Sequence, residues 1–142
     1  MTSSFVADAS VAVGWVHPAQ STADTAATLV AIAEGATLEV PALWPVEVAN
    51  ALTVLERRGK LTAAERQIAL GWLRGLRFRI DHEMAGQAFS RLSELASTYR
   101  LSVYDAAYLE LADRRHLPLA CKDASLRTAA KKCGVALYSL GL

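Results

Sequence analysis

The stretch Phe5-Val6-Ala7-Asp8-Ala9-Ser10-Val11-Ala12-Val13-Gly14-Trp15 decides the fold class of this chain. It begins as a short apolar run that ends in an acid, and small residues in a helical pattern follow. Such a run can belong to a buried strand or to a buried helix. Its place at the N-terminus, directly before a helical segment, favours a parallel strand that delivers Asp8 at its carboxyl end. The alternative is that Asp8 only caps the helix that follows.

The alternation of strand and helix continues along the chain. The pattern predicts further strands at residues 37–41, 78–81, 117–121 and 135–138, and helices at residues 21–34, 45–58, 62–73, 84–99, 103–115 and 124–132. Strands interleaved with helices indicate an α/β sandwich, in which helices flank a central, mostly parallel sheet.

Composition limits the class of protein. A length of 142 residues fits one domain, 1–142, and 53% hydrophobic with 20% charged residues excludes a disordered chain. No apolar run approaches the ~20 residues of a membrane helix, so we expect no membrane partner. The N-terminus shows no export signal, and Cys121 and Cys133 form no metal-ligand cluster, so a cytoplasmic location is expected.

Net charge does not by itself indicate a nucleic-acid partner, because it is only +1. Basic residues nevertheless occur in small groups that could meet phosphates. The alternative is that most of them are solvated helix ends, where Lys and Arg are favoured. These groups are Arg57-Arg58-Gly59-Lys60, Arg74 with Arg77 and Arg79, Arg114-Arg115 and Lys131-Lys132.

An acid also stands in the apolar stretch Leu101-Ser102-Val103-Tyr104-Asp105-Ala106-Ala107-Tyr108-Leu109. One interpretation is a helix start, with Ser102 as N-cap and Asp105 in the capping-box position. The other is a site acid at the edge of a pocket, held in place by packing of Tyr104 and the two alanines. The stretch alone leaves both open.

Two more acids stand at comparable element ends. Glu47 falls in the first turn of the helix that Pro45 opens, with Asn50 three residues later on the same side. The alternative is that Glu47 only complements the helix dipole and Asn50 is a surface residue. Asp123 repeats the arrangement of Asp8, because it follows a predicted strand and precedes a helix.

If the four acids converge, repulsion dominates their energetics. Ligands of parallel sheets bind outside the carboxyl ends of the strands, where Asp8 and Asp123 fall. Two carboxylates ~4 Å apart repel by about 4 kcal/mol at an effective dielectric constant near 20, so such a cluster calls for a cation. Carboxylate ligands without Cys or His suit Mg²⁺ or Mn²⁺, which can activate water and polarise a phosphoryl oxygen. The residues alone therefore predict metal-assisted phosphodiester hydrolysis.

Four segments resemble the motifs of PIN-domain ribonucleases in order and spacing, and more narrowly those of VapC toxins of toxin–antitoxin pairs. The resemblance covers essentially the whole chain. It implies a PIN-type α/β/α sandwich, an acidic Mg²⁺ or Mn²⁺ pocket, endonucleolytic cleavage of RNA, a homodimer and inhibition by a cognate small antitoxin protein. The segments are Val6-Ala7-Asp8-Ala9-Ser10, Pro41-Ala42-Leu43-Trp44-Pro45-Val46-Glu47-Val48-Ala49-Asn50-Ala51-Leu52, the stretch Leu101–Leu109 and Leu119-Ala120-Cys121-Lys122-Asp123-Ala124-Ser125-Leu126.

Carried onto this sequence, the resemblance assigns the metal and the attacking water to four catalytic acids. Two polar residues, Ser10 and Asn50, would orient those acids from beside the metal. The four acids are Asp8, Glu47, Asp105 and Asp123.

The chain departs from the resemblance at one position. The family usually has Thr or Ser two residues before the last acid, and here that residue is Cys121. Loss of the hydroxyl puts the hydrogen bonding around Asp123 in question. Lys122, between them, either contacts a phosphate or is a solvated charge.

Two other classes of protein remain as alternatives. A metal-dependent phosphohydrolase on another α/β plan, such as a haloacid-dehalogenase-like phosphatase, or a receiver domain would also gather acids at strand ends. The phosphatase would need a second Asp two residues beyond the first, where this chain has Ser10. A non-catalytic PIN-like RNA-binding module would keep the pocket and act by association.

Overall fold

The computed structural model describes residues 3–138, and strands and helices alternate along them as predicted. Short turns of 3₁₀ and π type are labelled η. In chain order the elements are β1 (Ser4–Ala7), α1 (Ala9–Val16), η1 (Pro18–Gln20), α2 (Ala23–Ala33), β2 (Thr37–Pro41), α3 (Trp44–Arg57), α4 (Ala63–Arg74), β3 (Phe78–Asp81), α5 (Met84–Gln87), η2 (Ala88–Leu92), α6 (Ser93–Tyr99), α7 (Val103–Arg115), β4 (Leu119–Ala120) and α8 (Ala124–Cys133).

The strands form one parallel sheet in the order β3-β2-β1-β4. The chain moves outward from β1 through β2 to β3, then returns across the sheet to place β4 on the other side of β1. The register pairs Ser4 with Thr37 and Val6 with Leu119. The strand order therefore reverses at β1, and the carboxyl ends of β1 and β4 flank a switch point of the kind where α/β proteins bind ligands.

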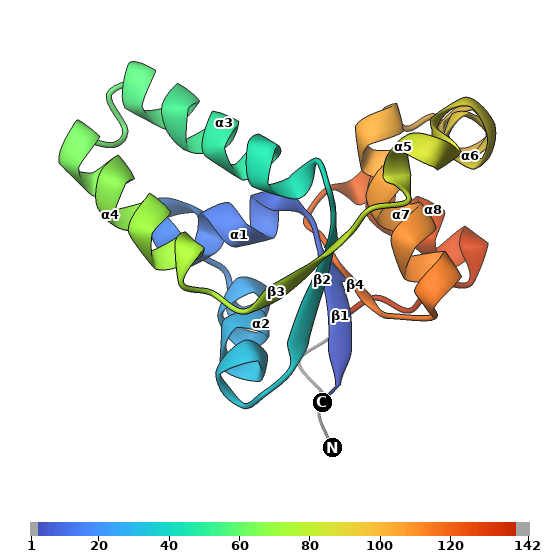
Figure 1. The fold of residues 1–142 in the computed structure, drawn as a ribbon, viewed down its shortest axis with the longest axis horizontal. Coiled ribbons are helices and arrows are strands. Elements are labelled where there is room, and N and C mark those ends of the chain that lie inside the picture. Colours follow the sequence, from blue (N-terminus) through green and yellow to red (C-terminus); the bar gives the residue numbers. More distant parts are fainter. Residues whose placement is uncertain (1–2, 139–142) are drawn as a thin grey trace.

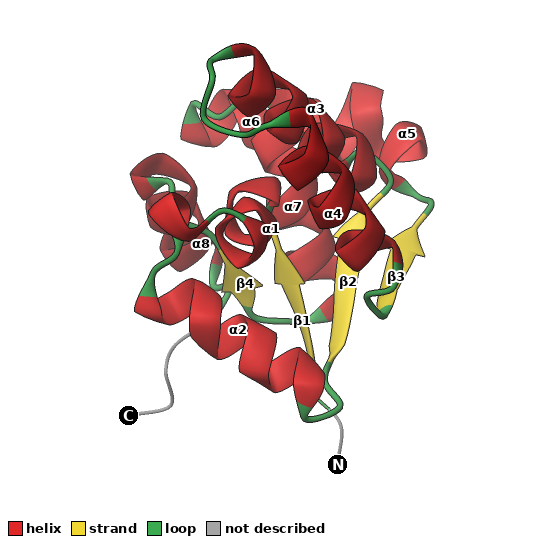
Figure 2. Ribbon diagram, turned by 90° about the vertical axis from the view of Figure 1, so that its left-hand side faces the viewer, coloured by secondary structure: helices red, strands yellow, loops and turns green. Residues whose placement is uncertain are grey.

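Helices cover both faces of the sheet. Helices α1 to α4 lie on one side of the strands and α5 to α8 on the other (Figure 1). Seen from the side, α2 crosses the lower part of the sheet and α3 and α4 stand above it (Figure 2). This arrangement confirms the predicted α/β/α sandwich with a parallel sheet. No helix among residues 3–138 is both long and apolar enough to cross a lipid bilayer.

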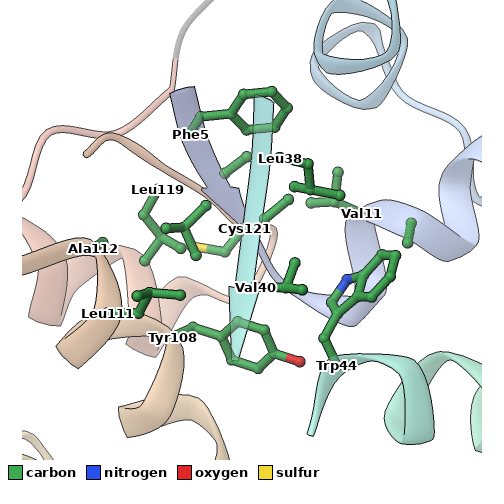
Figure 3. Close-up of a cluster of buried hydrophobic side chains, with 14 of the residues drawn as sticks. Phe5, Val11, Leu38, Val40, Trp44, Tyr108, Leu111, Ala112, Leu119 and Cys121 are labelled. Atoms are coloured by element: carbon green, nitrogen blue, oxygen red, sulfur yellow. The ribbon is translucent and has the colours of Figure 1, made fainter. Parts of the chain in front are cut away.

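The core lies on both faces of the sheet. Leu119 points from the sheet toward α7, whereas Leu38 points from the other face toward Val11 of α1 (Figure 3). Every residue from Ala106 to Ala112 is buried, because α7 contacts β1, β2 and β4 at once. Its alanines allow the helix backbone to approach the sheet closely, and burial of apolar surface is the main stabilising term here.

Two predicted elements differ in the structure. The strand expected at residues 135–138 is reduced to an isolated parallel bridge between Leu119 and Leu137, since β4 offers only two residues for pairing. The helix expected at residues 84–99 is interrupted by the π-turn η2, which is flanked by the short helices α5 and α6.

One of the basic pairs is used inside the fold. Arg114 on α7 forms ion pairs with Asp81 at the end of β3 (2.7 Å) and with Glu110 one turn earlier (2.8 Å). Its neighbour Arg115 pairs with the buried Glu39 of β2 at 3.0 Å. These contacts tie α7 to the sheet, so Arg114 and Arg115 are structural cations.

Candidate active site

The four predicted acids line one cavity of about 470 Å³ at the carboxyl ends of β1 and β4. Each comes from a different element, so only the folded chain brings them together. Asp8 is buried, Glu47 and Asp105 are half-buried and Asp123 is exposed. The residues that line the cavity are Asp8, Ala9, Ser10, Glu47, Asp105, Tyr108, Lys122 and Asp123.

Asp8 lies at the carboxyl end of β1, lines the cavity and also caps α1, so capping is one part of its role and not the whole of it. Its Oδ1 accepts hydrogen bonds from Ser10 Oγ (2.7 Å) and from the Val11 amide (3.2 Å). Burial, with 7% of the residue exposed, raises the pKa of Asp8 to about 6. The two hydrogen bonds oppose this shift, and the negative charges of Asp105 and Glu47 add to it.

Glu47 lies in the first turn of α3, where its Oε1 accepts a hydrogen bond of 2.5 Å from the Tyr108 hydroxyl. Burial raises the pKa of Glu47, the Tyr108 hydrogen bond opposes the shift, and the charge of Asp105 adds to it. Burial also raises the pKa of Tyr108 well above its ordinary range, and its hydrogen bond to Glu47 adds to this. The phenol therefore stays protonated and acts as a donor.

Asp105 and Asp123 both lie at helix starts. The amide of Asp105 donates to Ser102 Oγ at 3.0 Å, which makes Ser102 the N-cap of α7. Asp123 caps α8, since its Oδ2 accepts from the Leu126 amide at 2.9 Å. Burial raises the pKa of Asp105, and the neighbouring charge of Asp123 raises it further.

Lys122 is the one cation among the described residues that line the cavity. Its Nζ donates to the backbone carbonyl of Gln20 at 2.6 Å, and it forms no ion pair with the cavity acids within residues 3–138. Burial lowers the pKa of Lys122, while the charge of Asp8 opposes that shift. The negative charge of the cavity is thus left largely uncompensated by protein cations.

The donor set fits a hard divalent cation. Among residues 3–138, no three His, Cys, Asp or Glu side chains form a group placed to hold an ion together. Mg²⁺ keeps several waters and is commonly bound through one or two carboxylates, so a cavity with spread acids suits it. Three carboxyls with raised pKa values supply the charge that such an ion would neutralise.

The polar residues expected beside the acids differ in their placement. Ser10 lines the cavity and holds Asp8, as its predicted orienting role requires. Asn50 is exposed on α3, does not line the cavity and makes no side-chain hydrogen bond among the described residues.

Tyr108 is the site residue that the sequence interpretation missed. It stands three residues after Asp105, so the spacing on one helix face could have indicated it. Tyr104, which was expected to pack against Asp105, is 64% exposed, and that prediction was wrong. Of the three residues predicted to pack there, Ala106 and Ala107 are buried.

Cys121 does not replace a hydroxyl at Asp123. Its side chain joins the apolar cluster between the sheet and α7 (Figure 3). Burial, together with the charge of Asp8, raises the pKa of its thiol to about 12. Asp123 instead takes its hydrogen bond from the backbone of α8.

The fold and the cavity define an α/β/α protein that gathers carboxylates at the switch point of a parallel sheet. The sequence matches the family model described as PIN domain over residues 5–132. This match covers most of the chain, which therefore belongs to the PIN domain family. PIN domains are generally nucleases, and PIN nucleases generally depend on divalent metal ions.

Solved structures share this fold at low sequence identity. The structure of PAE2754 from Pyrobaculum aerophilum has a TM-score of 0.67 and 22% identity over 91% of this chain and 86% of the other. VapBC2 from Rickettsia felis, bound to a DNA fragment from its promoter, has a TM-score of 0.66 and 11% identity over 95% of this chain and 97% of the other. FitAcB from Neisseria gonorrhoeae has a TM-score of 0.65 and 18% identity over 96% of this chain and 97% of the other. No curated protein matches the sequence.

Proposed function

We propose that this chain is a single PIN domain, residues 1–142, that acts as an endoribonuclease dependent on Mg²⁺ or Mn²⁺. The observation that carries the proposal is the convergence of Asp8, Glu47, Asp105 and Asp123 on one cavity. Desolvation raises the pKa values of the first three of these carboxyls. Such a cavity repels a polyanion until a cation occupies it. Nuclease chemistry in the PIN family supports the same assignment.

The bound cation would supply a Lewis acid and lower the pKa of a water molecule near the scissile phosphate. The protein fixes the carboxylates in advance. Ser10 and the Val11 amide hold Oδ1 of Asp8, and Tyr108 holds Oε1 of Glu47. Because these donors favour the charged carboxylates, they partly offset the burial that would otherwise keep the acids protonated.

Lys122 is placed to meet the negative charge of the substrate. Its ammonium lies at the cavity and is held by the Gln20 carbonyl, a neutral acceptor that leaves its charge available. We propose that it contacts an oxygen of the RNA backbone, and that in-line attack by water leaves a 5′-phosphate and a 3′-hydroxyl.

The cellular role that we propose is the toxin of a toxin–antitoxin pair, acting in the cytoplasm as a homodimer. Two proteins of the same fold are VapBC2 and FitAcB, and this supports a cognate small antitoxin protein as partner. The antitoxin would restrain the nuclease until it is removed.

The test is cleavage of structured RNAs by the purified protein in Mg²⁺ or Mn²⁺, with the ends of the products mapped. We expect Asp8→Asn and Asp105→Asn to lose at least about a hundredfold in rate, and EDTA to abolish cleavage. Asp24→Asn changes an exposed acid in the first turn of α2 and is the matched control.

Full activity of Asp8→Asn, or cleavage that persists in EDTA, would overturn the assignment. Binding of RNA by the wild-type protein without turnover would indicate a non-catalytic binding module instead.

A further inference from the structure

A second hollow, of about 420 Å³, lies between the end of α6 and the outer face of α8. We call it the α6–α8 hollow. Its walls carry the cations Arg100 and Lys132 and the hydroxyls of Thr98, Ser125 and Thr128. The small side chains of Ala124 and Ala129 also line its α8 wall.

Residues on both walls of the hollow lie close in sequence to acids of the cavity. Ser125 belongs to the first turn of α8, the turn that Asp123 caps from within the acid cavity. On the opposite wall, Arg100 ends α6 and the chain then passes through Ser102 to Asp105. The α6–α8 hollow therefore lies beside Asp105 and Asp123, on the α8 side of the acid cavity.

The charge of the hollow is opposite to that of the cavity beside it. No acid is among its described lining residues, and neither Arg100 nor Lys132 takes part in an ion pair or a side-chain hydrogen bond within residues 3–138. Two unpaired cations with hydroxyl donors around them form a setting that attracts an anion.

The donors are arranged in a line along α8. Ser125, Thr128 and Lys132 are spaced by three and four residues, so they share one face of the helix. Lys132 lies about 10 Å further along α8 than Ser125, at a rise of 1.5 Å per residue. A polynucleotide backbone leaving the acid cavity could therefore follow this face.

Backbone geometry fixes the opposite wall. Arg100 has a left-handed φ of 55° and closes α6, with its amide donating to the Ala96 carbonyl. This conformation costs free energy for a residue other than glycine. It sets the start of the Arg100 side chain at the rim of the hollow, opposite α8.

We propose that the α6–α8 hollow binds a phosphodiester group of the RNA that flanks the scissile one, with Arg100 and Lys132 as its cationic contacts. This rests on the proposed nuclease function. The four acids of the cavity need a metal ion to attract the scissile phosphate, whereas the α6–α8 hollow attracts the neighbouring backbone without one. It thereby sets the direction in which the strand crosses the site.

The experiment measures binding of a short single-stranded RNA by fluorescence anisotropy over a range of NaCl concentrations. The parent protein is Asp8→Asn with Mg²⁺, so that RNA is bound without being cut. We compare the pair Arg100→Gln with Lys132→Gln against the control pair Arg77→Gln with Lys131→Gln. The control residues are exposed cations, and Lys131 neighbours Lys132 but does not line the hollow.

We expect the Arg100 and Lys132 pair to bind about tenfold more weakly and to lower the salt slope by about 0.7, the value for the loss of one phosphate contact on a single strand. The control pair changes affinity by less than about twofold. Thermal unfolding checks that the variants are folded. As a second measurement that leaves the protein intact, neutral methylphosphonate linkages are scanned along the RNA. One flanking linkage should weaken binding to the parent but not to the Arg100 and Lys132 pair.

The outcomes separate this inference from the proposed function. Absence of RNA binding by the parent and of cleavage by the wild-type protein would overturn both. Normal cleavage by the wild-type protein, together with equal salt slopes for the two pairs of variants, would overturn only the inference that the α6–α8 hollow binds RNA. The Arg100 and Lys132 pair could instead show an unchanged salt slope of RNA binding and a changed oligomeric state in light scattering. That result would assign the hollow to a protein contact and would also overturn the inference.

Discussion

The hydroxyl of Tyr108 on α7 donates to Oε1 of Glu47 on α3 at 2.5 Å. The bond joins two helices from opposite sides of the sheet at the acid cavity. Tyr108 is buried in the core, so the same side chain packs the sheet and fixes a site carboxylate. Packing of the core and geometry of the site are therefore coupled through this residue.

Replacing Tyr108 with Phe should weaken both metal binding and folding. Without the donor, the pKa of Glu47 rises further above its ordinary range, because the hydrogen bond opposes that rise in the wild type. We expect severalfold weaker Mn²⁺ binding near pH 6.5, recovering toward pH 8, and a loss of about 1–2 kcal/mol in the free energy of unfolding. Calorimetric titration with Mn²⁺ and urea denaturation measure the two effects.

The control for this variant is Tyr104→Phe, on the same helix but with an exposed ring. It should leave both quantities unchanged. Equal Mn²⁺ affinity for Tyr108→Phe and wild type at pH 6.5 would mean that the phenol does not position Glu47.

The two cysteines should differ sharply in reactivity. Cys121 is 5% exposed and burial raises the pKa of its thiol to about 12, so only about one thiol in ten thousand is ionised at pH 8. Cys133 is partly exposed at the end of α8. In a reaction with Ellman's reagent at pH 8 we expect one fast thiol in the native protein and two after unfolding.

Cys133→Ser should remove the fast phase and leave Cys121 unreactive until denaturant is added. A fast phase that survives in Cys133→Ser would place Cys121 nearer to solvent than the apolar cluster allows.

Local patterns were sufficient to predict most of the fold. Strands β2 and β3 lie at the residues predicted for them, the first from its terminal Pro41 and the second from its alternating pattern, and Gly134 ends α8 with a left-handed φ of 82°. The strand expected at residues 135–138 failed because its length depends on its partner β4, which has two residues.

Two pairs of residues with the same spacing show which part of the site could not be predicted from the sequence. Asn50 follows Glu47 by three residues, and Tyr108 follows Asp105 by three. The sequence interpretation placed Asn50 beside the acids, yet Asn50 faces solvent, whereas Tyr108 lines the cavity. Helix α7 is buried at every residue from Ala106 to Ala112, and this stretch includes Tyr108. Helix α3 is buried along one stripe only, and the angle of that stripe depends on tertiary packing.

Arg114 should be important for stability and not for RNA cleavage. It pairs with Glu110, of which 4% is exposed, and with Asp81 at the end of β3. Arg114→Met leaves Glu110 without its partner, and we expect a loss of about 2–4 kcal/mol in the free energy of unfolding at pH 7. Arg91→Met is the control, because its exposed pair with Asp113 at 3.4 Å should be worth less than about 1 kcal/mol.

The Arg114 effect should also depend on pH. Burial alone would raise the pKa of Asp81, but the hydrogen bonds and charge of Arg114 outweigh it and hold that pKa below its ordinary value. The stabilisation is therefore present above about pH 4 and is lost as the pH falls through the lowered pKa. Urea denaturation at pH 7 and pH 3 should show a smaller difference between wild type and Arg114→Met at pH 3. An equal difference at both pH values would contradict the role of Asp81.

Asp8 should make the metal-free protein less stable as the pH rises. Its pKa in the fold is about 6, against about 4 in an unfolded chain, so the native state binds more protons between these values. Stability from this group is complete below about pH 4 and is lost as the pH rises through 6, a change on the order of 2–3 kcal/mol. In EDTA, Asp8→Asn should thus be more stable than wild type at pH 7.5 by about 1–3 kcal/mol, and nearly equal to it at pH 4.

Saturating Mg²⁺ should remove this advantage at pH 7.5, because a cation that binds only the native wild-type site adds stability by mass action. The control Asp24→Asn alters an exposed acid and should show neither effect. Urea denaturation at the two pH values, with and without Mg²⁺, measures all of these differences. Wild type in EDTA could instead be as stable as Asp8→Asn at pH 7.5. The charged, buried carboxylate would then not destabilise the metal-free protein, and the electrostatic argument for a cation in the acid cavity would fail.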